Sequence, residues 1–148
     1  MGDCIIDCCS LLNLYAGWGG LEELRGLNHT WHICEAGLAE SEFTREYGPE
    51  GLPVDVALDL YPLIDSALLH RARPETDTEL ADYVNFAGEV DDGEAQALAI
   101  AKGRKYILLT DDRKATRIAN RADVGVQTIR LSGFSGCGSS TRQQIQKR

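Results

Sequence analysis

Short apolar runs constrain the fold of this chain more than any other feature. Each run is long enough for a buried strand and too short for a packed helix, and helical patterns separate the runs. Strands are predicted at residues 4–7, 30–34, 105–109 and 124–129. Short apolar strands that alternate with helices are typical of a parallel sheet covered on both faces. The sequence therefore predicts an α/β fold with a central parallel sheet.

Amphipathic and alanine-rich patterns predict the helices that lie between these strands. The first helix follows the first strand to about residue 15, and a helical turn is expected at 21–27. The other helices are predicted at residues 36–47, 58–69, 75–87, 94–102 and 112–122. Gly88 and Gly103 are expected to close two of these helices, and the Gly48-Pro49 pair is expected to stop a third.

The length of 148 residues is sufficient for one domain with a real hydrophobic core. We expect that domain at residues 1–131, followed by a flexible glycine-serine tail at 132–148. No apolar run approaches the roughly 20 residues that a membrane helix needs. Acidic Asp3 stands where a signal peptide would carry basic residues. The sequence therefore predicts a cytoplasmic protein with no membrane segment.

The cysteine content bears on whether this is a zinc protein, and the net charge bears on whether it binds nucleic acid. The 5 cysteines include no C-x-x-C pair, and no histidine has zinc-ligand spacing to a cysteine pair, so a structural zinc is not expected. The formal net charge of −8 has the wrong sign for a nucleic-acid binder, because phosphate contacts normally need lysine and arginine. Local basic patches remain compatible with that charge, and so does an ordinary solvated helix face. The residues concerned are Arg71, Arg73, Arg113, Lys114, Arg117 and Arg121.

Asp7 ends the first apolar run, at the carboxyl end of the first predicted strand. Open α/β sheets place their ligands at this end of the strands. Aspartate is also a favoured residue at the position before a helix, so a helix cap explains Asp7 equally simply. The residue alone leaves both interpretations open.

Two glutamates lie on helix faces that are otherwise apolar. Glu40 shares a face of the predicted 36–47 helix with Ala36, Gly37, Phe43 and Tyr47. Glutamate is rarely buried on such an apolar face without a partner. Glu94 begins the stripe that continues through Leu98 on an alanine-rich helix. Its position in the first turn suits an anion, because the helix dipole favours negative charge there. Asp91 and Asp92 are better interpreted as caps of the same helix.

A further pair of acids follows a buried strand and precedes a helix. Asp111 lies four residues before Ala115 and Asp112 lies three before it, so either can face the edge of the core. One is expected to cap the helix and the other to belong to a site. Periodicity does not distinguish between them.

We therefore expect four acids to lie together at one end of the sheet: Asp7, Glu40, Glu94 and one of Asp111 and Asp112. Two carboxylates about 5 Å apart repel by roughly 3 kcal/mol at an effective dielectric constant near 20. Divalent cations remove that repulsion, and oxygen ligands select hard ions such as Mg²⁺ or Mn²⁺. The acids together predict a metal site.

The stretches that carry these acids are IIDCCSLLNLY, CEAGLAESEF, DDGEAQALAIA and LLTDDRKATRIA. In this order they resemble the acidic motifs of the PIN-domain nucleases, and most of all the VapC-like toxins of toxin–antitoxin pairs. The similarity covers about residues 3–129. The strongest part is GEAQALAIA followed closely by LLTDDRKA.

The resemblance implies a Rossmann-like α/β/α sandwich that binds Mg²⁺ or Mn²⁺ and hydrolyses RNA by a two-metal mechanism. Asp7 matches the acid after the first strand, Glu40 the helical glutamate, and Glu94 the acid that opens a later helix. Asp112 fits a Thr-x-Asp pattern, Asp111 fits relatives with paired acids, and Thr110 matches the family's hydroxyl residue. An antitoxin partner and a homodimer are expected on the same grounds.

This chain departs from the family pattern at two places. Cys9 stands where many relatives have serine, and the tail lacks a closing helix. These departures favour the main alternative, a catalytically degenerate module that binds RNA or a protein. Another Mg²⁺-dependent phosphohydrolase or a receiver domain fits less well, because Asp7-Cys8-Cys9 lacks the paired acids that both classes need near the first strand.

Overall fold

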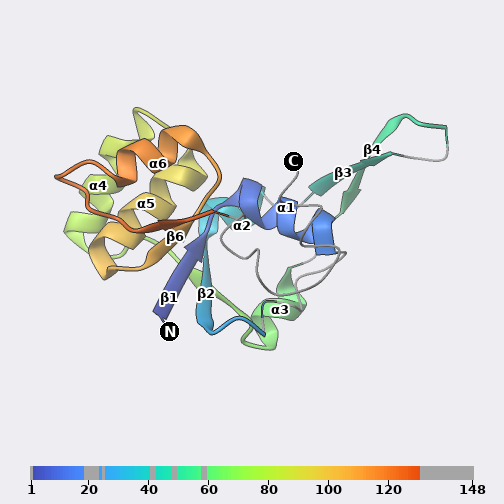
Figure 1. The fold of residues 1–148 in the computed structure, drawn as a ribbon, viewed down its shortest axis with the longest axis horizontal. Helices are drawn as coiled ribbons and strands as arrows, with labels where there is room; N and C mark the ends of the chain where they lie inside the picture. The colour runs from blue at the N-terminus through green and yellow to red at the C-terminus, as the bar shows by residue number, and fades with distance from the viewer. Residues whose placement is uncertain are drawn as a thin grey trace.

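The computed structural model describes residues 2–18, 24, 26–40, 43–47, 50–57 and 60–130. Its strands are β1 Gly2–Ile6, β2 His29–Cys34, β3 Phe43–Tyr47, β4 Pro53–Ala57, β5 Leu69–Ala72, β6 Ile107–Leu109 and β7 Thr128–Ile129. Its helices are α1 Cys8–Trp18, α2 Glu35–Glu40, α3 Tyr61–Asp65, α4 Asp77–Ala87, α5 Asp92–Arg104 and α6 Arg113–Ala119. Figure 1 shows their arrangement in space. None of the helices in these ranges is long and apolar enough to cross a bilayer.

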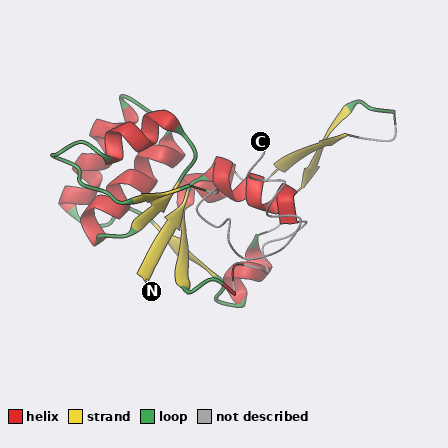
Figure 2. Ribbon diagram, viewed as in Figure 1, coloured by secondary structure: helices red, strands yellow, loops and turns green. Residues whose placement is uncertain are grey.

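Five parallel strands form the central sheet in the order β5-β2-β1-β6-β7. Helices cover both faces: α4, α5 and α6 lie on one side, and α1 and α3 on the other (Figure 2). The predicted α/β/α sandwich with a central parallel sheet is therefore confirmed. A second sheet consists of the antiparallel pair β3 and β4, which projects from the body of the molecule.

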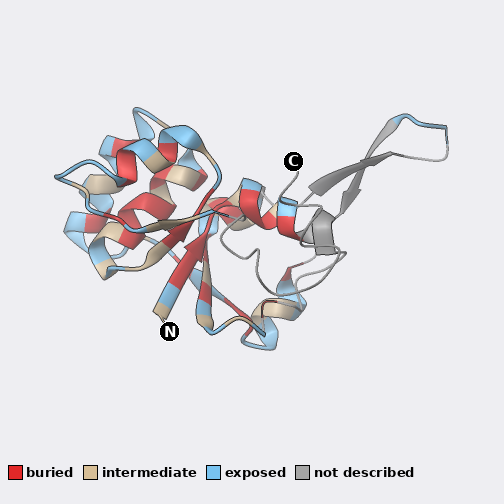
Figure 3. Ribbon diagram, viewed as in Figure 1, coloured by how far each residue is buried: buried red, intermediate tan, exposed pale blue. Residues whose placement is uncertain are grey.

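The core has two halves, one on each face of the sheet, because successive strand residues point in opposite directions. Ile6 and Ile33 pack with Leu11 and Leu14 of α1. On the other face, Ile5 and Leu108 pack with Phe86, Ile118 and the alanines of α5. Burial is concentrated in the central strands and on the inner sides of the helices (Figure 3). The alanine-rich α5 can approach the sheet closely because its side chains are small.

Side-chain caps begin the two long helices that cover this second face. Thr76 accepts a hydrogen bond from the backbone N–H of Glu79 at 3.1 Å, and Asp91 accepts one from Glu94 at 2.9 Å. These contacts satisfy N–H groups that have no partner inside the helix. Gly88 ends α4, as predicted. Asp91 is confirmed as a cap, whereas Asp92 is the first residue of α5.

Several predicted element boundaries are wrong. The helix predicted at 36–47 ends at Glu40, and residues 43–47 form β3 instead. Of the predicted 58–69 helix, the structure describes residues 60–69, and within these only Tyr61–Asp65 is helical. The last predicted residue, Leu69, starts the edge strand β5. A helix that continued through residue 69 is not compatible with this structure, because β5 begins at Leu69 and pairs with β2.

The remaining differences concern ends of elements. Gly103 lies inside α5 rather than closing it, and Lys105 ends the helix in a left-handed conformation with φ 58°. The strand predicted at 105–109 is therefore limited to Ile107–Leu109, and the last one to Thr128–Ile129. Helix α6 ends at Ala119 and not at 122. The predicted tail at 132–148 and most of the 21–27 turn lie outside the described residues.

Candidate metal centre

Asp7 follows β1 directly and is almost completely buried, with 2% of its surface exposed. One carboxylate oxygen, Oδ1, accepts a hydrogen bond of 2.7 Å from the backbone N–H of Ser10, in the first turn of α1. The other oxygen, Oδ2, accepts from the hydroxyl of Thr110, which is also fully buried. The interpretation of Asp7 as a cap of α1 is therefore confirmed, and its second oxygen is held toward the end of β6. Its role as a ligand stays a prediction.

The environment of Asp7 disfavours the charged carboxylate. Burial raises the pKa of Asp7 above its usual value, and the charge of Asp111 raises it further, while hydrogen bonds from Thr110 and Ser10 lower it. The neighbours that act on Asp7 most strongly are thus neutral donors and another acid. A cation beside this carboxylate would offset the cost of its burial.

The turn after β6 separates the roles of its two acids. Asp112 is the cap of α6, since its Oδ1 accepts from the backbone N–H of Ala115 at 2.7 Å. The backbone N–H of Asp112 donates to the hydroxyl oxygen of Thr110 at 3.1 Å. Asp111 is exposed, and its charge acts on Asp7. Asp111 is thus the acid of this turn that is coupled to Asp7, and Asp112 the one that fixes the helix.

Glu94 reaches the same edge of the sheet from α5. The thiol of Cys34, at the end of β2, donates to the backbone carbonyl of Gly93 at 3.4 Å. The backbone N–H of Ala36 donates to the side chain of Gln96 at 3.0 Å. These contacts tie the first turn of α5, which contains half-buried Glu94, to the carboxyl end of β2. Strand β2 is the neighbour of β1 in the sheet.

Three acids act on the thiol of Cys9, a residue of α1. Burial raises its pKa to about 11, and the charges of Asp7, Glu94 and Asp91 add to the shift. Carboxylates from β1, from α5 and from the residue that caps α5 thus act on one side chain of α1. Negative charge is concentrated at this edge of the sheet.

Glu40 is the last residue of α2. Its side chain lies outside the described part of the structure. The helical face that suggested Glu40 is partly wrong, because Phe43 and Tyr47 belong to β3 rather than to the same helix. Only Gly37 and Ala36 remain on that face. A role for Glu40 at the site stays a prediction.

Ser10 is a residue of this site that the sequence pattern did not reveal. It is fully buried, its backbone N–H binds Asp7, and its hydroxyl helps to lower the pKa of Asp7. That hydroxyl oxygen makes no hydrogen bond of normal geometry to any described residue. The family's serine position holds Cys9 in this chain, so Ser10 supplies a buried hydroxyl close by. Only the spacing from Asp7, typical of a capped helix turn, could have indicated it.

The donors at this edge fit a hard divalent cation. They are carboxylate and hydroxyl oxygens, and the most buried carboxylate has a raised pKa. Within the described side chains, however, no three histidine, cysteine, aspartate or glutamate residues are close enough together to hold a metal ion. Among the described side chains, Asp7 and its neighbours therefore form at most a partial set of ligands.

Comparison with known proteins identifies a matching family model and supports the fold. A family model described as a PIN domain matches residues 4–129. The solved structure of PAE2754 from Pyrobaculum aerophilum aligns over 100% of both chains with a TM-score of 0.52 and 13% identity. SSO1118, a PilT N-terminus domain protein from the archaeon Sulfolobus solfataricus, aligns over 93% of this chain and 98% of its own, with a TM-score of 0.48 and 15% identity. Among curated protein sequences none matches this chain.

Proposed function

Because this chain belongs to the PIN-domain family, whose members are generally nucleases that depend on divalent metals, we propose that it is an endoribonuclease. It hydrolyses phosphodiester bonds of RNA with Mg²⁺ or Mn²⁺. The single observation that carries this proposal is the state of Asp7. A buried carboxylate with a raised pKa stands at the carboxyl edge of a parallel sheet, coupled to a second acid.

In this proposal the protein's own groups hold and orient the ligands. Asp7, Glu94 and Asp111 present carboxylates to the metal. Glu40 and the second carboxylate oxygen of Asp112, Oδ2, complete the set of ligands. Thr110 holds one oxygen of Asp7 in place and is itself held by the N–H of Asp112. When bound, divalent ions supply activation of the attacking water and stabilisation of the leaving oxygen.

Rigidity of this arrangement comes from the chain around the acids. Both oxygens of Asp7 have donors from different elements, one from α1 and one from the end of β6. Fixed donors keep a metal ligand in one orientation and tune its basicity. The side chain of Asp7 is thus prepared for a ligand before any metal arrives.

The decisive variant is Asp7→Asn, which keeps the shape and most hydrogen bonds but removes the charge. We expect metal-dependent cleavage of RNA to fall by at least about 100-fold while the melting temperature stays at or above that of the wild type. Cleavage of a labelled RNA is followed on denaturing gels with Mn²⁺ and with EDTA.

Asp65→Asn is the matched control, since Asp65 is an exposed aspartate at the end of α3, remote in the sequence from every acid of the site. It should cleave RNA as fast as the wild type. Wild-type activity in Asp7→Asn would defeat the assignment of the site.

The toxin role is the finer part of the same proposal. It is supported by the resemblance of the four acidic stretches to VapC-like toxins. Such a protein acts on cytoplasmic RNA and is restrained by an antitoxin encoded beside it. A small DNA-binding protein in the adjacent gene, which restores growth when both are expressed, would support this role. Self-association as a homodimer also stays a prediction, which light scattering in solution checks.

A further inference from the structure

The register of the central sheet brings an arginine into the same row as Asp7. Ile6 pairs with Leu109, and Leu109 pairs with Ile129. The next residue on each strand continues that row: Asp7, then Thr110, then Arg130. The backbone N–H of Thr110 donates to the carbonyl of Ile129 at 3.0 Å, so pairing extends to the end of both strands. Arg130 therefore lies one strand beyond Thr110.

The alternation of side chains places Arg130 on the same face of the sheet as Asp7. Ile6 and Leu109 belong to the core on the α1 face, and Ile129 packs against it. The residues that follow them must point to the opposite face. The hydrogen bond between Thr110 and Asp7 fits this direction. Arg130 is exposed to solvent, two strands away from Asp7 along this row.

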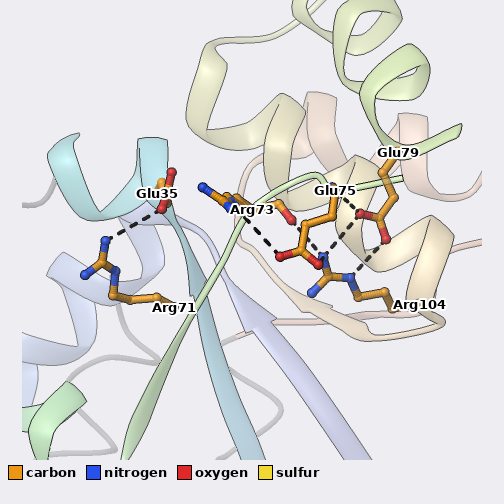
Figure 4. A network of polar contacts seen from close by, with 6 residues as sticks. All are labelled: Glu35, Arg71, Arg73, Glu75, Glu79 and Arg104. Atoms are coloured by element: carbon orange, nitrogen blue, oxygen red, sulfur yellow. Dashed lines mark hydrogen bonds and ion pairs between the residues drawn. The ribbon is translucent and has the colours of Figure 1, made fainter. Parts of the chain in front are cut away.

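A second arginine flanks the acids at the opposite edge of the sheet. Arg73 follows the last residue of β5, and its carbonyl accepts a hydrogen bond of 2.7 Å from the guanidinium of Arg104. The backbone of Arg73 is thus fixed, while its side chain is 65% exposed and lies 3.8 Å from the carboxylate of Glu75 (Figure 4). An exposed ion pair at this distance is worth little, so a phosphate can replace the carboxylate.

Cations thus stand at both ends of the carboxyl edge, with the acids between them. The edge strands β5 and β7 are about 19 Å apart, at about 4.8 Å for each neighbouring pair of strands. The net charge of −8 repels a nucleic acid from most of the surface, so local cations must hold it at a site of this kind. Asp7 is recessed, and a flexible single strand can bring one phosphate down to it more easily than a duplex.

We propose that Arg73 and Arg130 bind phosphates of a single RNA strand that crosses the carboxyl ends of the strands. Their phosphates lie on either side of the bond to be cut. This inference rests on the proposed function, because it places the same substrate on the same site. It assigns two arginines from opposite edges of the sheet to substrate binding, outside the acidic motifs.

The test measures RNA binding separately from cleavage. Fluorescence anisotropy of a labelled single-stranded oligoribonucleotide gives Kd at several salt concentrations, with Mg²⁺ present and Asp7→Asn in the background to prevent cleavage. Arg73→Ala and Arg130→Ala should each weaken binding by about 10-fold and lower the slope of log K against log salt by about 0.7. Arg130→Lys should restore most of the affinity, because a phosphate contact needs charge more than a particular shape.

Arg121→Ala is the control, because Arg121 is an exposed arginine beyond the end of α6, paired with Glu89 at 2.7 Å. It should bind RNA as the background does. Unchanged Kd and salt slope in both Arg73→Ala and Arg130→Ala, or no RNA binding by the background protein at all, would overturn the inference. Cleavage by the Asp7→Asn background would instead overturn the proposed function and leave the binding result to decide this inference on its own.

Discussion

Thr110 joins the parts of the candidate site through one hydroxyl group. The hydroxyl donates to Asp7 and accepts from the backbone N–H of Asp112. All of these contacts lie in or at the edge of the core, where Thr110 itself has 0% exposure. A single buried oxygen thus fixes both a proposed metal ligand and the start of a helix.

Thr110→Val removes this hydroxyl and keeps the shape of the side chain. We expect a loss of about 1–3 kcal/mol in the free energy of unfolding, because a buried carboxylate loses a donor and an N–H loses an acceptor. Metal-dependent RNA cleavage should fall as well, since one oxygen of Asp7 is no longer oriented. Urea unfolding and RNA cleavage measure the two effects.

Thr110→Ser is the matched control, since it retains the hydroxyl and loses only a methyl group. It should keep most of the activity and lose less stability than Thr110→Val. A loss in Thr110→Ser as large as that in Thr110→Val would contradict this prediction, because the retained hydroxyl would then not be sufficient for stability and activity.

At the level of residues, sequence reasoning could single out Asp7 and Glu94, because an acid at the end of a buried strand or on an apolar helix face is unusual. Their roles as metal ligands stay predictions. The sequence could not show which of Asp111 and Asp112 caps α6. The two residues are adjacent, and only the backbone direction at the start of the helix distinguishes the cap from its neighbour. Ser10 was missed for a similar reason: its burial depends on how α1 turns away from β1.

An ion pair between buried Glu79 and partly exposed Arg104 connects α4 to α5, away from the candidate metal centre. Glu79 is 3% exposed and accepts from Nε of Arg104 at 3.0 Å and from Nη2 at 3.2 Å. The backbone N–H of Glu75 also donates to Glu79, at 2.8 Å (Figure 4). The guanidinium and this N–H hold the carboxylate against α5, where Gly103 leaves room for it. A Cβ at Gly103 would approach Cγ of Glu79 to 2.8 Å.

Gly103→Ala is therefore expected to destabilise the protein even though alanine is the better helix former. Alanine contributes about 1 kcal/mol inside a helix, whereas overpacking against a fixed side chain costs about 1–3 kcal/mol. Displacement of the ion pair between Glu79 and Arg104 adds to that cost. We expect a net loss of about 1–2 kcal/mol in the free energy of unfolding, measured in urea.

Gly88→Ala is the control for this prediction, because a Cβ there meets only the carbonyl of Asn85, at an ordinary 3.5 Å. Its effect should stay within about 1 kcal/mol. A Gly103→Ala variant as stable as the wild type would show that Glu79 can move aside without loss.

At the level of elements, sequence reasoning succeeded where a helix or strand was strongly patterned. The helices α4 and α5 and the strands β1 and β2 were predicted to within a few residues. The β3–β4 hairpin was missed, because its first strand continues the charged pattern of α2 and looks helical. Phe43, Thr44 and Tyr47 favour a strand, and Gly51 has the positive φ of 74° that a tight turn requires. In the prediction, the helical spacing of residues 36–47 outweighed those signals.

The whole molecule combines a strongly negative charge with a site that concentrates acids further. Of the groups that act most on Asp7, none is a cation. An ion that binds several carboxylates from separate elements does so only in the folded protein. Metal binding and stability should therefore be linked.

Addition of Mn²⁺ is expected to raise the melting temperature of the wild type. At a concentration about 100 times Kd, the ion contributes about 2.7 kcal/mol, which corresponds to a shift of several degrees for a chain of this size. Differential scanning fluorimetry with and without EDTA measures the shift.

The same scan with Asp7→Asn should show a much smaller shift, because the central ligand has lost its charge. Two identical shifts would place the ion elsewhere on the protein. No shift in the wild type would favour the alternative function, a degenerate module that binds RNA or a protein.

At the level of the whole molecule, the layer architecture followed from the alternation of strands and helices. The order of the strands could not be predicted, because apolar runs carry no information about which strand lies beside which. That order decides the neighbours of each strand end. Arg130 drew no attention in the sequence for this reason: its relation to Asp7 exists only through two successive strand pairings.

The position of β1 in the middle of the sheet has a consequence for biosynthesis. Its Asp7 obtains its second donor from a residue 103 positions further along the chain. A growing polypeptide on the ribosome therefore has no complete centre until the segment that contains β6 has emerged. Because the protein is proposed to cut RNA, the ribosome that synthesises it is not exposed to this activity until nearly the whole domain has been translated.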